Sequence, residues 1–236
     1  MKKLFLLAFL AVGMTANAET IVNHDDDETV DKSAIDMGQG KDENDRWSMH
    51  VAVGVNIPID TPDGVNFAPF RSWEFNWTVF QYDYTPKDWK TTFSAGLGFN
   101  WRRYTLKGHD KMFGKVDDWV WVHTPDQKMD DLSSNVHTTS LNVPLLVKQR
   151  FSKSFAISLG AQVNWNFWGR MRNYYEDGDN QFDITTKDIG HRPFTVDVLG
   201  IVHFGKIGIY CKYSPMSVLK KDRGPGFQSL AVGLRL

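Results

Sequence analysis

The chain has 236 residues, of which 42% are hydrophobic and 14% aromatic, and its formal net charge is -1. This charge gives no electrostatic basis for binding nucleic acid, so we expect no nucleic-acid partner. The single cysteine, Cys211, excludes an internal disulfide and a cysteine-rich zinc site, and we expect no cofactor and no metal.

The N-terminal residues differ in character from the rest of the chain. Residues 1–18 have the features of a signal peptide: two lysines, an apolar run over 4–12, and a small-x-small cleavage site at Ala16–Ala18. We therefore predict Sec-dependent export. Residues 19–45 hold ten acidic residues and two lysines, with almost no large apolar side chain. Such a segment cannot bury enough surface to fold, so we predict a disordered acidic tail in the periplasm.

From residue 46 onward, apolar and polar residues alternate, which is the period of a β-strand with two unlike faces. The clearest case is 155–167, where every second residue is apolar. Shorter segments repeat the pattern on both sides of it. The predicted strands, in chain order, are 47–56, 72–79, 92–102, 140–150, 155–167, 194–204, 206–213 and 229–236.

The connections between these predicted strands alternate in length. The short ones lie at 85–89, at 152–154 and around Gly205, and the long ones at 57–70, 105–137, 169–192 and 214–227. This alternation is typical of an up-and-down membrane barrel. It predicts short turns on the periplasmic side and long loops on the outside.

The size of the side chains on the apolar face determines which face of the strands points inward. It carries roughly forty residues, many of them Trp or Phe, whereas an eight-stranded barrel is barely wide enough for side chains to fill it. The apolar face must therefore point outward to lipid, while the Gly, Ser, Ala, Asn and Thr of the other face fill the interior. We predict an all-β fold over residues 46–236, an eight-stranded antiparallel up-and-down transmembrane β-barrel in the bacterial outer membrane.

Charged residues also fall on the inward face, where Glu74 and Asp197 are the only acids. Unpaired charges in a dry interior are very costly, so we expect ion pairs that close the lumen. Neighbouring strands suggest the pairs Glu74–Arg102 and Asp197–Lys212. An ion or proton path through the same charges is the alternative. The predicted charge network comprises Glu74, Arg102, Lys148, Arg150, Asp197, Lys212 and Arg235.

The second long loop contains the motif "DDWVWVHTP", in which Trp119 and Trp121 alternate with valines. This alternation predicts a hairpin that extends beyond the membrane. The alternative is an exposed aromatic patch through which the loop contacts a protein or glycan partner.

Two segments resemble a known family. "SLNVPLLVKQRFSKSFAISLGAQVNW" resembles the central hairpin of the PorT-like outer-membrane barrels of Bacteroidetes, and "YCKYSPMSVLKKDRGPGFQSLAVGLRL" resembles their last two strands. The resemblance implies an outer-membrane barrel with a structural or interaction role. The chain departs from many outer-membrane barrels at Leu236, where they end in an aromatic residue. We expect a monomer surrounded by outer-membrane lipid, and no enzymatic activity.

Two other functions remain as alternatives. A lipid-modifying outer-membrane enzyme would need a base and a nucleophile, but His137 and Ser140 are three residues apart and fall on opposite faces of a strand. A soluble lipocalin-like carrier would place the apolar face inside, against the volume of its side chains.

Overall fold

The computed structural model describes residues 45–126, 129–178 and 180–236, which form mainly antiparallel β-sheet. The predicted signal peptide and acidic tail lie outside the described residues, except that Asp45 begins the first strand. No helix among the described residues is long and apolar enough to cross a membrane. The elements are β1 (Asp45–Ile59), η2 (Pro69–Arg71), β2 (Trp73–Tyr84), β3 (Thr91–Thr105), β4 (Met112–Val116), β5 (Trp119–His123), β6 (Asp130–Arg150), β7 (Phe155–Asp177), β8 (Asn180–Lys187), β9 (Phe194–Phe204), β10 (Ile207–Ser214) and β11 (Gln228–Arg235).

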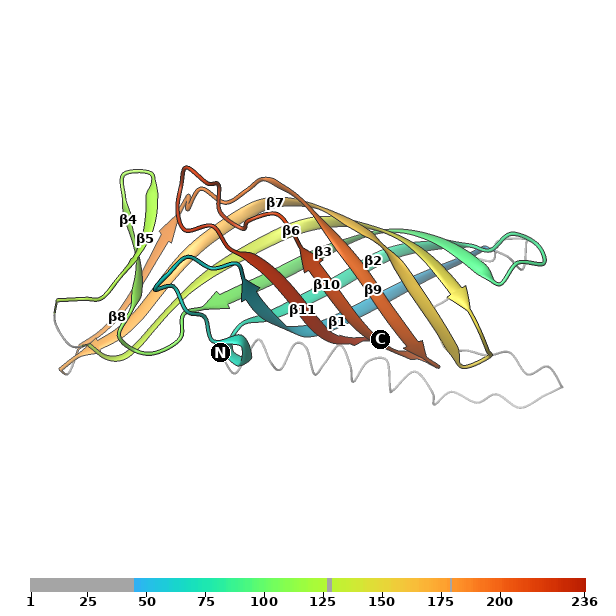
Figure 1. The fold of residues 1–236 in the computed structure, drawn as a ribbon, viewed down its shortest axis with the longest axis horizontal. Coiled ribbons are helices and arrows are strands. Elements are labelled where there is room, and N and C mark those ends of the chain that lie inside the picture. The colour runs from blue at the N-terminus through green and yellow to red at the C-terminus, as the bar shows by residue number, and fades with distance from the viewer. Residues whose placement is uncertain (1–44, 127–128, 179) are drawn as a thin grey trace, which may run out of the picture. The chain divides into compact units, whose positions relative to one another are not determined.

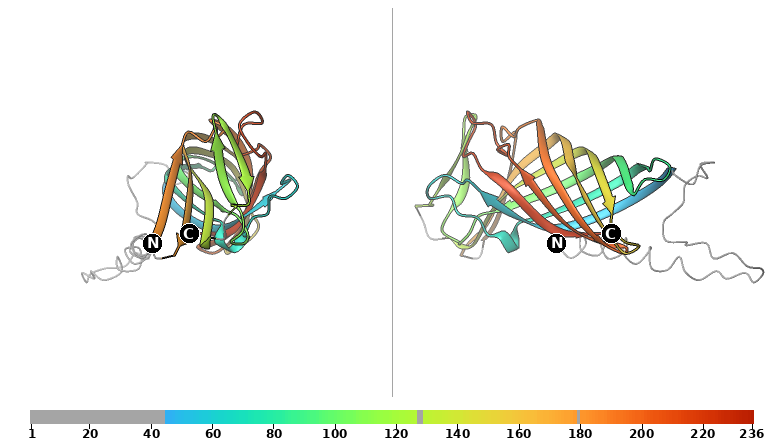
Figure 2. Two further views of the ribbon diagram at one scale, coloured as in Figure 1. Left: turned by 90° about the vertical axis from the view of Figure 1, so that its left-hand side faces the viewer. Right: turned by 45° about the vertical axis from the view of Figure 1, so that its right-hand side comes forward.

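Eight of these strands close into a ring. Their order is β6-β3-β2-β1-β11-β10-β9-β7, and β6 also pairs with β7. All these pairs are antiparallel, and ring neighbours follow one another along the chain apart from the inserted β4, β5 and β8. The strands are strongly inclined in Figure 1, and the left panel of Figure 2 shows them surrounding a common axis. The structure confirms the predicted strands and their closed up-and-down order.

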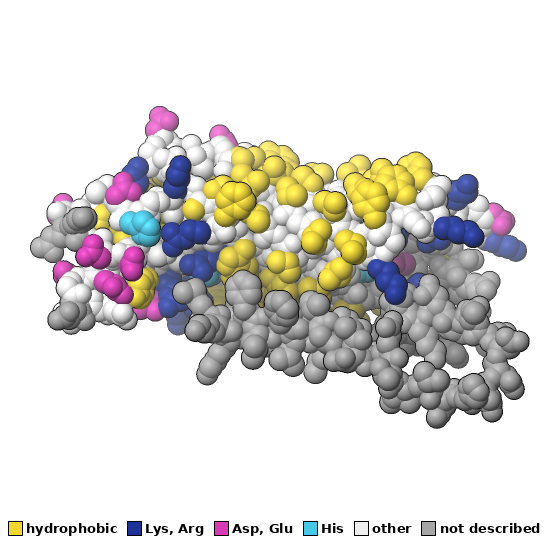
Figure 3. Space-filling view, turned by 90° about the horizontal axis from the view of Figure 1, so that it is seen from below, with side chains coloured by type: hydrophobic (Ala, Val, Ile, Leu, Met, Phe, Trp, Pro, Cys, Tyr) yellow, Lys and Arg dark blue, Asp and Glu magenta, His cyan; other side chains and the backbone are white. Residues whose placement is uncertain are grey.

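The two faces of the ring differ in polarity. Along β10, residues alternate strictly between exposed and buried. On the face drawn in Figure 3, hydrophobic side chains gather along the middle and charged side chains lie toward the two ends. The exposed large hydrophobic residues include Trp47, Val53, Trp77, Phe80, Phe93, Leu97, Val143, Leu145, Val147, Leu159, Val163, Trp165, Phe194, Val198, Phe204, Ile209, Val232 and Leu234. The fully buried polar residues include Asn56, Glu74, Asn100, Asn142, Asn164 and Asp197.

β6 and β7 extend well past the predicted strands, to 21 and 23 residues. Parts of the predicted loops 105–137 and 169–192 are therefore strand, and β8 adds to the edge of β7. In these extensions the polarity of the faces is reversed: Val136 and Met171 are buried, whereas His137 and Arg170 are only half-buried. The interior of the extensions thus includes large apolar side chains next to buried polar ones.

One extra residue in β2, a β-bulge, changes the register of this strand with both of its neighbours near the short turns. The β1–β2 pairing shifts between Ser48 and His50, and the β2–β3 pairing shifts between Thr78 and Phe80. Beyond this bulge, Gln81 is buried inside the ring, and Asp83 lies on the same face. The expectation that only two acids face inward is wrong, because the bulge adds a third.

The long loops pack together into an apolar cap. β4 and β5 form a separate two-stranded hairpin, as the motif "DDWVWVHTP" predicts. Phe67 and Phe227, from two different loops, have ring centroids 4.7 Å apart. The buried members of the cap are Val65, Phe67, Tyr104, Leu106, Phe113, Val120, Val136, Met171, Ile189, Val218, Leu219 and Phe227. The long loops therefore have a core of their own.

The first prediction concerns the packing of Tyr210 inside the ring. A methyl group on Gly54 would lie 2.2 Å from Tyr210 Oη and 2.7 Å from the carbonyl oxygen of Val232. We expect Gly54→Ala to lower the free energy of unfolding by about 1–3 kcal/mol, the usual cost of overpacking.

The matched control is Gly200→Ala, because the nearest atoms to a methyl group there are 3.9 Å away. This control should cost less than about 1 kcal/mol. Urea unfolding of the refolded protein in detergent measures both variants, and equal midpoints would contradict the assigned position of Tyr210.

Candidate functional site: a charge cluster inside the barrel

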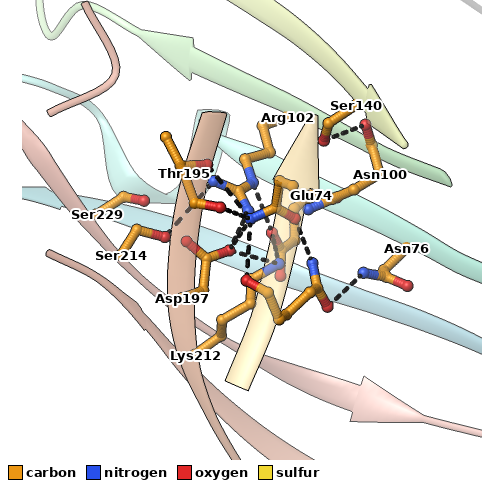
Figure 4. A network of polar contacts seen from close by, with 12 residues as sticks. Glu74, Asn76, Asn100, Arg102, Ser140, Thr195, Asp197, Lys212, Ser214 and Ser229 are labelled. Atoms are coloured by element: carbon orange, nitrogen blue, oxygen red, sulfur yellow. Dashed lines mark hydrogen bonds and ion pairs between the residues drawn. The ribbon is translucent and has the colours of Figure 1, made fainter. Parts of the chain in front are cut away.

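Four buried charged residues meet in the interior of the ring (Figure 4): Glu74 of β2, Arg102 of β3, Asp197 of β9 and Lys212 of β10. β2 and β3 lie across the ring from β9 and β10. Lys212 Nζ is 2.8 Å from Glu74 Oε2, and Arg102 Nη2 donates to Asp197 Oδ2. These contacts join opposite walls of the barrel, and two acids balance two cations.

Neutral polar groups complete the cluster. Tyr210 Oη donates to Glu74 Oε1 at 2.9 Å, and Asn164 Nδ2 donates to Asp197 Oδ2 at 2.9 Å. Gln162 donates to Asn164 at 2.7 Å. Hydrogen bonds of this kind offset the cost of moving charges out of water, and they fix the rotamers of the side chains involved.

The observed pairing differs in detail from the expected one. Both expected pairs are in contact range, with Arg102 Nε 3.5 Å from Glu74 Oε2 and Lys212 Nζ 4.0 Å from Asp197 Oδ2. The tighter contacts, however, are the crossed ones, Lys212–Glu74 and Arg102–Asp197. Strand adjacency suggested neighbours, but long basic side chains in a narrow interior also reach the opposite wall.

The other predicted members lie nearer the short turns. Arg235 is buried and donates to Gln81 Oε1, and Gln81 in turn donates to Asp83 at 2.7 Å. Lys148 is half-buried and is outside the four-residue cluster. Arg150 is exposed at the end of β6, outside the four-residue cluster.

Side chains fill the interior next to the cluster. A cavity lined by His50, Glu74, Gln162, Tyr210 and Arg235, among others, offers about 20 Å³ to a water molecule. That volume suits about one water and not a continuous water column. Together with the paired charges, this favours a plug at this level of the barrel over an open channel.

The candidate chemical groups do not come together. His137 is half-buried on the outward face, whereas Ser140 is buried inside and lies 3.5 Å from the carbonyl oxygen of Asn100. Among the described residues, no group of three or more His, Cys, Asp or Glu side chains could hold a metal ion.

The two loop tryptophans lie on the surface of the hairpin. Trp119 and Trp121 are 47% and 43% exposed, and Trp121 stacks on His123 with ring centroids 4.5 Å apart. Val120, between them, is buried in the cap. The alternation read from the sequence therefore separates one buried face of the hairpin from an aromatic face.

No family model and no curated protein matches the chain. Among solved structures, it is similar to Ail, the attachment invasion locus protein of Yersinia pestis, in a complex with the heparin analogue sucrose octasulfate. The identity is 12% and the TM-score 0.34, over 82% of this chain and 99% of that chain. A TM-score this low does not establish a shared fold.

The second prediction concerns coupling within the charge cluster. Glu74→Gln and Lys212→Met should each lower the free energy of unfolding by about 3–5 kcal/mol, because each leaves a buried charge with fewer partners. The double variant keeps the Arg102–Asp197 contact, so it should be more stable than the sum of the singles by about 1–3 kcal/mol.

A second double-mutant cycle combines Asp197→Asn with Lys212→Met. The charged atoms of Asp197 and Lys212 are 4.0 Å apart, compared with 2.8 Å for Glu74 and Lys212. Its coupling energy should be smaller. Denaturant titrations in detergent provide both cycles, and a larger coupling in the second cycle would show that Lys212 belongs mainly to Asp197.

Proposed function

We propose that this protein is an outer-membrane β-barrel, exported through Sec, with a lumen filled by side chains and a structural or interaction role. The observation that carries the proposal is the polarity of the ring. Leu159 and Leu234 are 62% and 55% exposed, whereas Glu74 and Asp197 are fully buried. Lipid around the ring would cover the first pair, and the closed sheet pairs the backbone groups that lipid could not.

The reversal of polarity in the extended strands supports a membrane around the middle of the ring only. Past the apolar band, the large apolar residues Val136 and Met171 are buried. A soluble carrier would keep an apolar interior along its whole length. The polar interior of the ring therefore disfavours the lipocalin-like alternative.

We further propose that the protein is of the PorT-like type and acts as a monomer. The two segments that carry the resemblance form the β6–β7 hairpin and the neighbouring strands β10 and β11. The loops present a packed surface on which Trp119 and Trp121 are the proposed contacts for a protein or glycan partner. Cross-linking in intact cells, with Trp119→Ala and Trp121→Ala as variants, tests this contact.

A role in lipid modification is disfavoured by the separation of His137 from Ser140 on the two faces of β6. Mass spectrometry of lipid A from a strain that lacks the gene tests this alternative. An altered lipid A that is restored by the wild-type gene would favour an enzyme.

The third prediction tests the lipid-facing surface. Leu159→Arg should destabilise the barrel in a bilayer by about 2–4 kcal/mol, the cost of a basic side chain near the midplane. Ile184→Arg is the matched control, because Ile184 is exposed on β8, outside the ring. Urea unfolding in lipid vesicles measures both, and equal stabilities would place Leu159 in water.

The fourth prediction tests orientation. Asp126 lies in the long connection before β6, and Lys153 lies in the short turn between β6 and β7. We expect an epitope tag at Asp126 to be labelled in intact cells and a tag at Lys153 only after the outer membrane is opened. The reverse labelling pattern would invert the proposed topology.

A further inference from the structure

A row of basic residues crosses four strands on the outer surface. Arg103 of β3 lies opposite His137 of β6, His137 lies opposite Arg170 of β7, and Arg170 lies opposite Lys187 of β8. Directly paired residues on neighbouring antiparallel strands project from the same face, with Cβ atoms about 4.5–5.5 Å apart. Arg103, His137, Arg170 and Lys187 therefore form a continuous line, called the basic row below.

The basic row lies directly beyond the apolar band. The next outward-facing row toward the middle of the barrel consists of Trp101, Thr139 and Trp168. Trp168 is 42% exposed, and the Arg170 guanidinium carbon lies 4.8 Å from the centroid of the Trp168 ring. Tryptophan at the border of an apolar band is typical of a membrane interface. The row thus lies at the level where lipid headgroups would begin.

Within the described part of the chain, no acid lies within ion-pair distance of the basic row. The charged groups that act on His137 are Arg103, Arg170 and Arg172, which are all cations. Asp183 acts electrostatically on Arg170, but it is hydrogen-bonded to Arg172, whose Nε lies 2.7 Å from Asp183 Oδ1. That hydrogen bond lowers the pKa of Asp183, so it stays charged and engaged.

The arginines of the row also have unused donors. The Nε atoms of Arg103 and Arg170 are buried and donate no hydrogen bond within the described part of the chain. Arg71 and Arg172 add positive charge near Arg103. Cations this close to one another, with more positive than negative charge around them, repel one another, and a bound anion would relieve this repulsion.

We propose that the basic row binds the phosphate of an anionic lipid in the surrounding leaflet, an inference that rests on the membrane location proposed above. The guanidinium fork matches phosphate oxygens in geometry and charge. Arg103 and Arg170 are two strand spacings apart, about 9–10 Å, so their long side chains can converge on one headgroup beside His137. The acyl chains would lie along the apolar band below Trp101 and Trp168.

The experiment measures lipid binding to the purified full chain in neutral detergent by native mass spectrometry. The probe is dioleoyl phosphatidic acid, with dioleoylglycerol and inorganic phosphate as separate arms. We expect wild type to bind phosphatidic acid and the double variant Arg103→Gln/Arg170→Gln to bind it at least about tenfold more weakly, since two charge-assisted contacts are lost. The double variant Arg103→Lys/Arg170→Lys, which keeps the charge, should retain part of the affinity.

The control variant is Lys220→Gln/Lys221→Gln, which removes the same charge from exposed positions in the last long loop. Its affinity should stay within about twofold of wild type, because exposed distant charges are screened by salt. Equal binding by wild type and the Arg-to-Gln variant would overturn the proposal. So would an equal loss in the control, or binding of dioleoylglycerol or inorganic phosphate as tight as that of phosphatidic acid.

Folding and membrane location are measured separately. If the double variant does not refold, the single variants Arg103→Gln and Arg170→Gln are each compared with wild type for their binding of phosphatidic acid. Carbonate extraction of wild-type membranes tests the location: release without detergent would overturn the proposed function. A membrane-embedded wild type whose Arg-to-Gln variants bind normally would overturn the lipid site alone.

Discussion

The width of an eight-stranded ring is the constraint on which the rest of the structure depends. Such a ring has room for a filling of side chains and little else. Bulky residues such as Leu159 and Phe194 must therefore face outward, where they are largely exposed. Apolar area left in water costs about 25 cal/mol per Å², so a continuous belt of such residues calls for an apolar surrounding. The same narrow interior forces charges that enter it to meet one another.

The charge cluster follows from that second effect. Glu74 and Lys212 start from strands on opposite sides of the ring, yet their charged atoms are 2.8 Å apart. A buried ion pair can cost as much in desolvation as it gains in attraction, so the cluster is weak evidence for high stability. It does fix which side chains fill the lumen, because removing any one partner leaves a buried charge with fewer partners. A filled lumen is consistent with the proposed role, in which the protein acts through contacts on its outer surface and loops.

The period of two in the sequence was sufficient to predict the closed ring, because an apolar outer face and a packed polar interior leave a strict alternation in segments such as 155–167. The period of two could not predict local irregularities of the strands. One extra residue near Val79 shifts β2 by one position and turns Asp83 inward. The apolar cap was also missed, since Phe67, Phe113 and Phe227 come from three separate loops and carry no common period. The crossed ion pairs depend on side-chain reach, which strand adjacency does not describe.

The end of the apolar band on β7 shows how one residue joins two environments. The β6–β7 register shifts between Thr139, opposite Trp168, and Ser140, opposite Asn166, so Phe167 is the extra residue. Without this bulge, the alternation that places Leu159 outward would turn Met171 outward and Arg170 inward. With it, Met171 joins the apolar cap and Arg170 comes level with Arg103 across His137. On β7 the bulge thus exchanges the residues of the two faces, at the level where the surroundings would change from lipid to water.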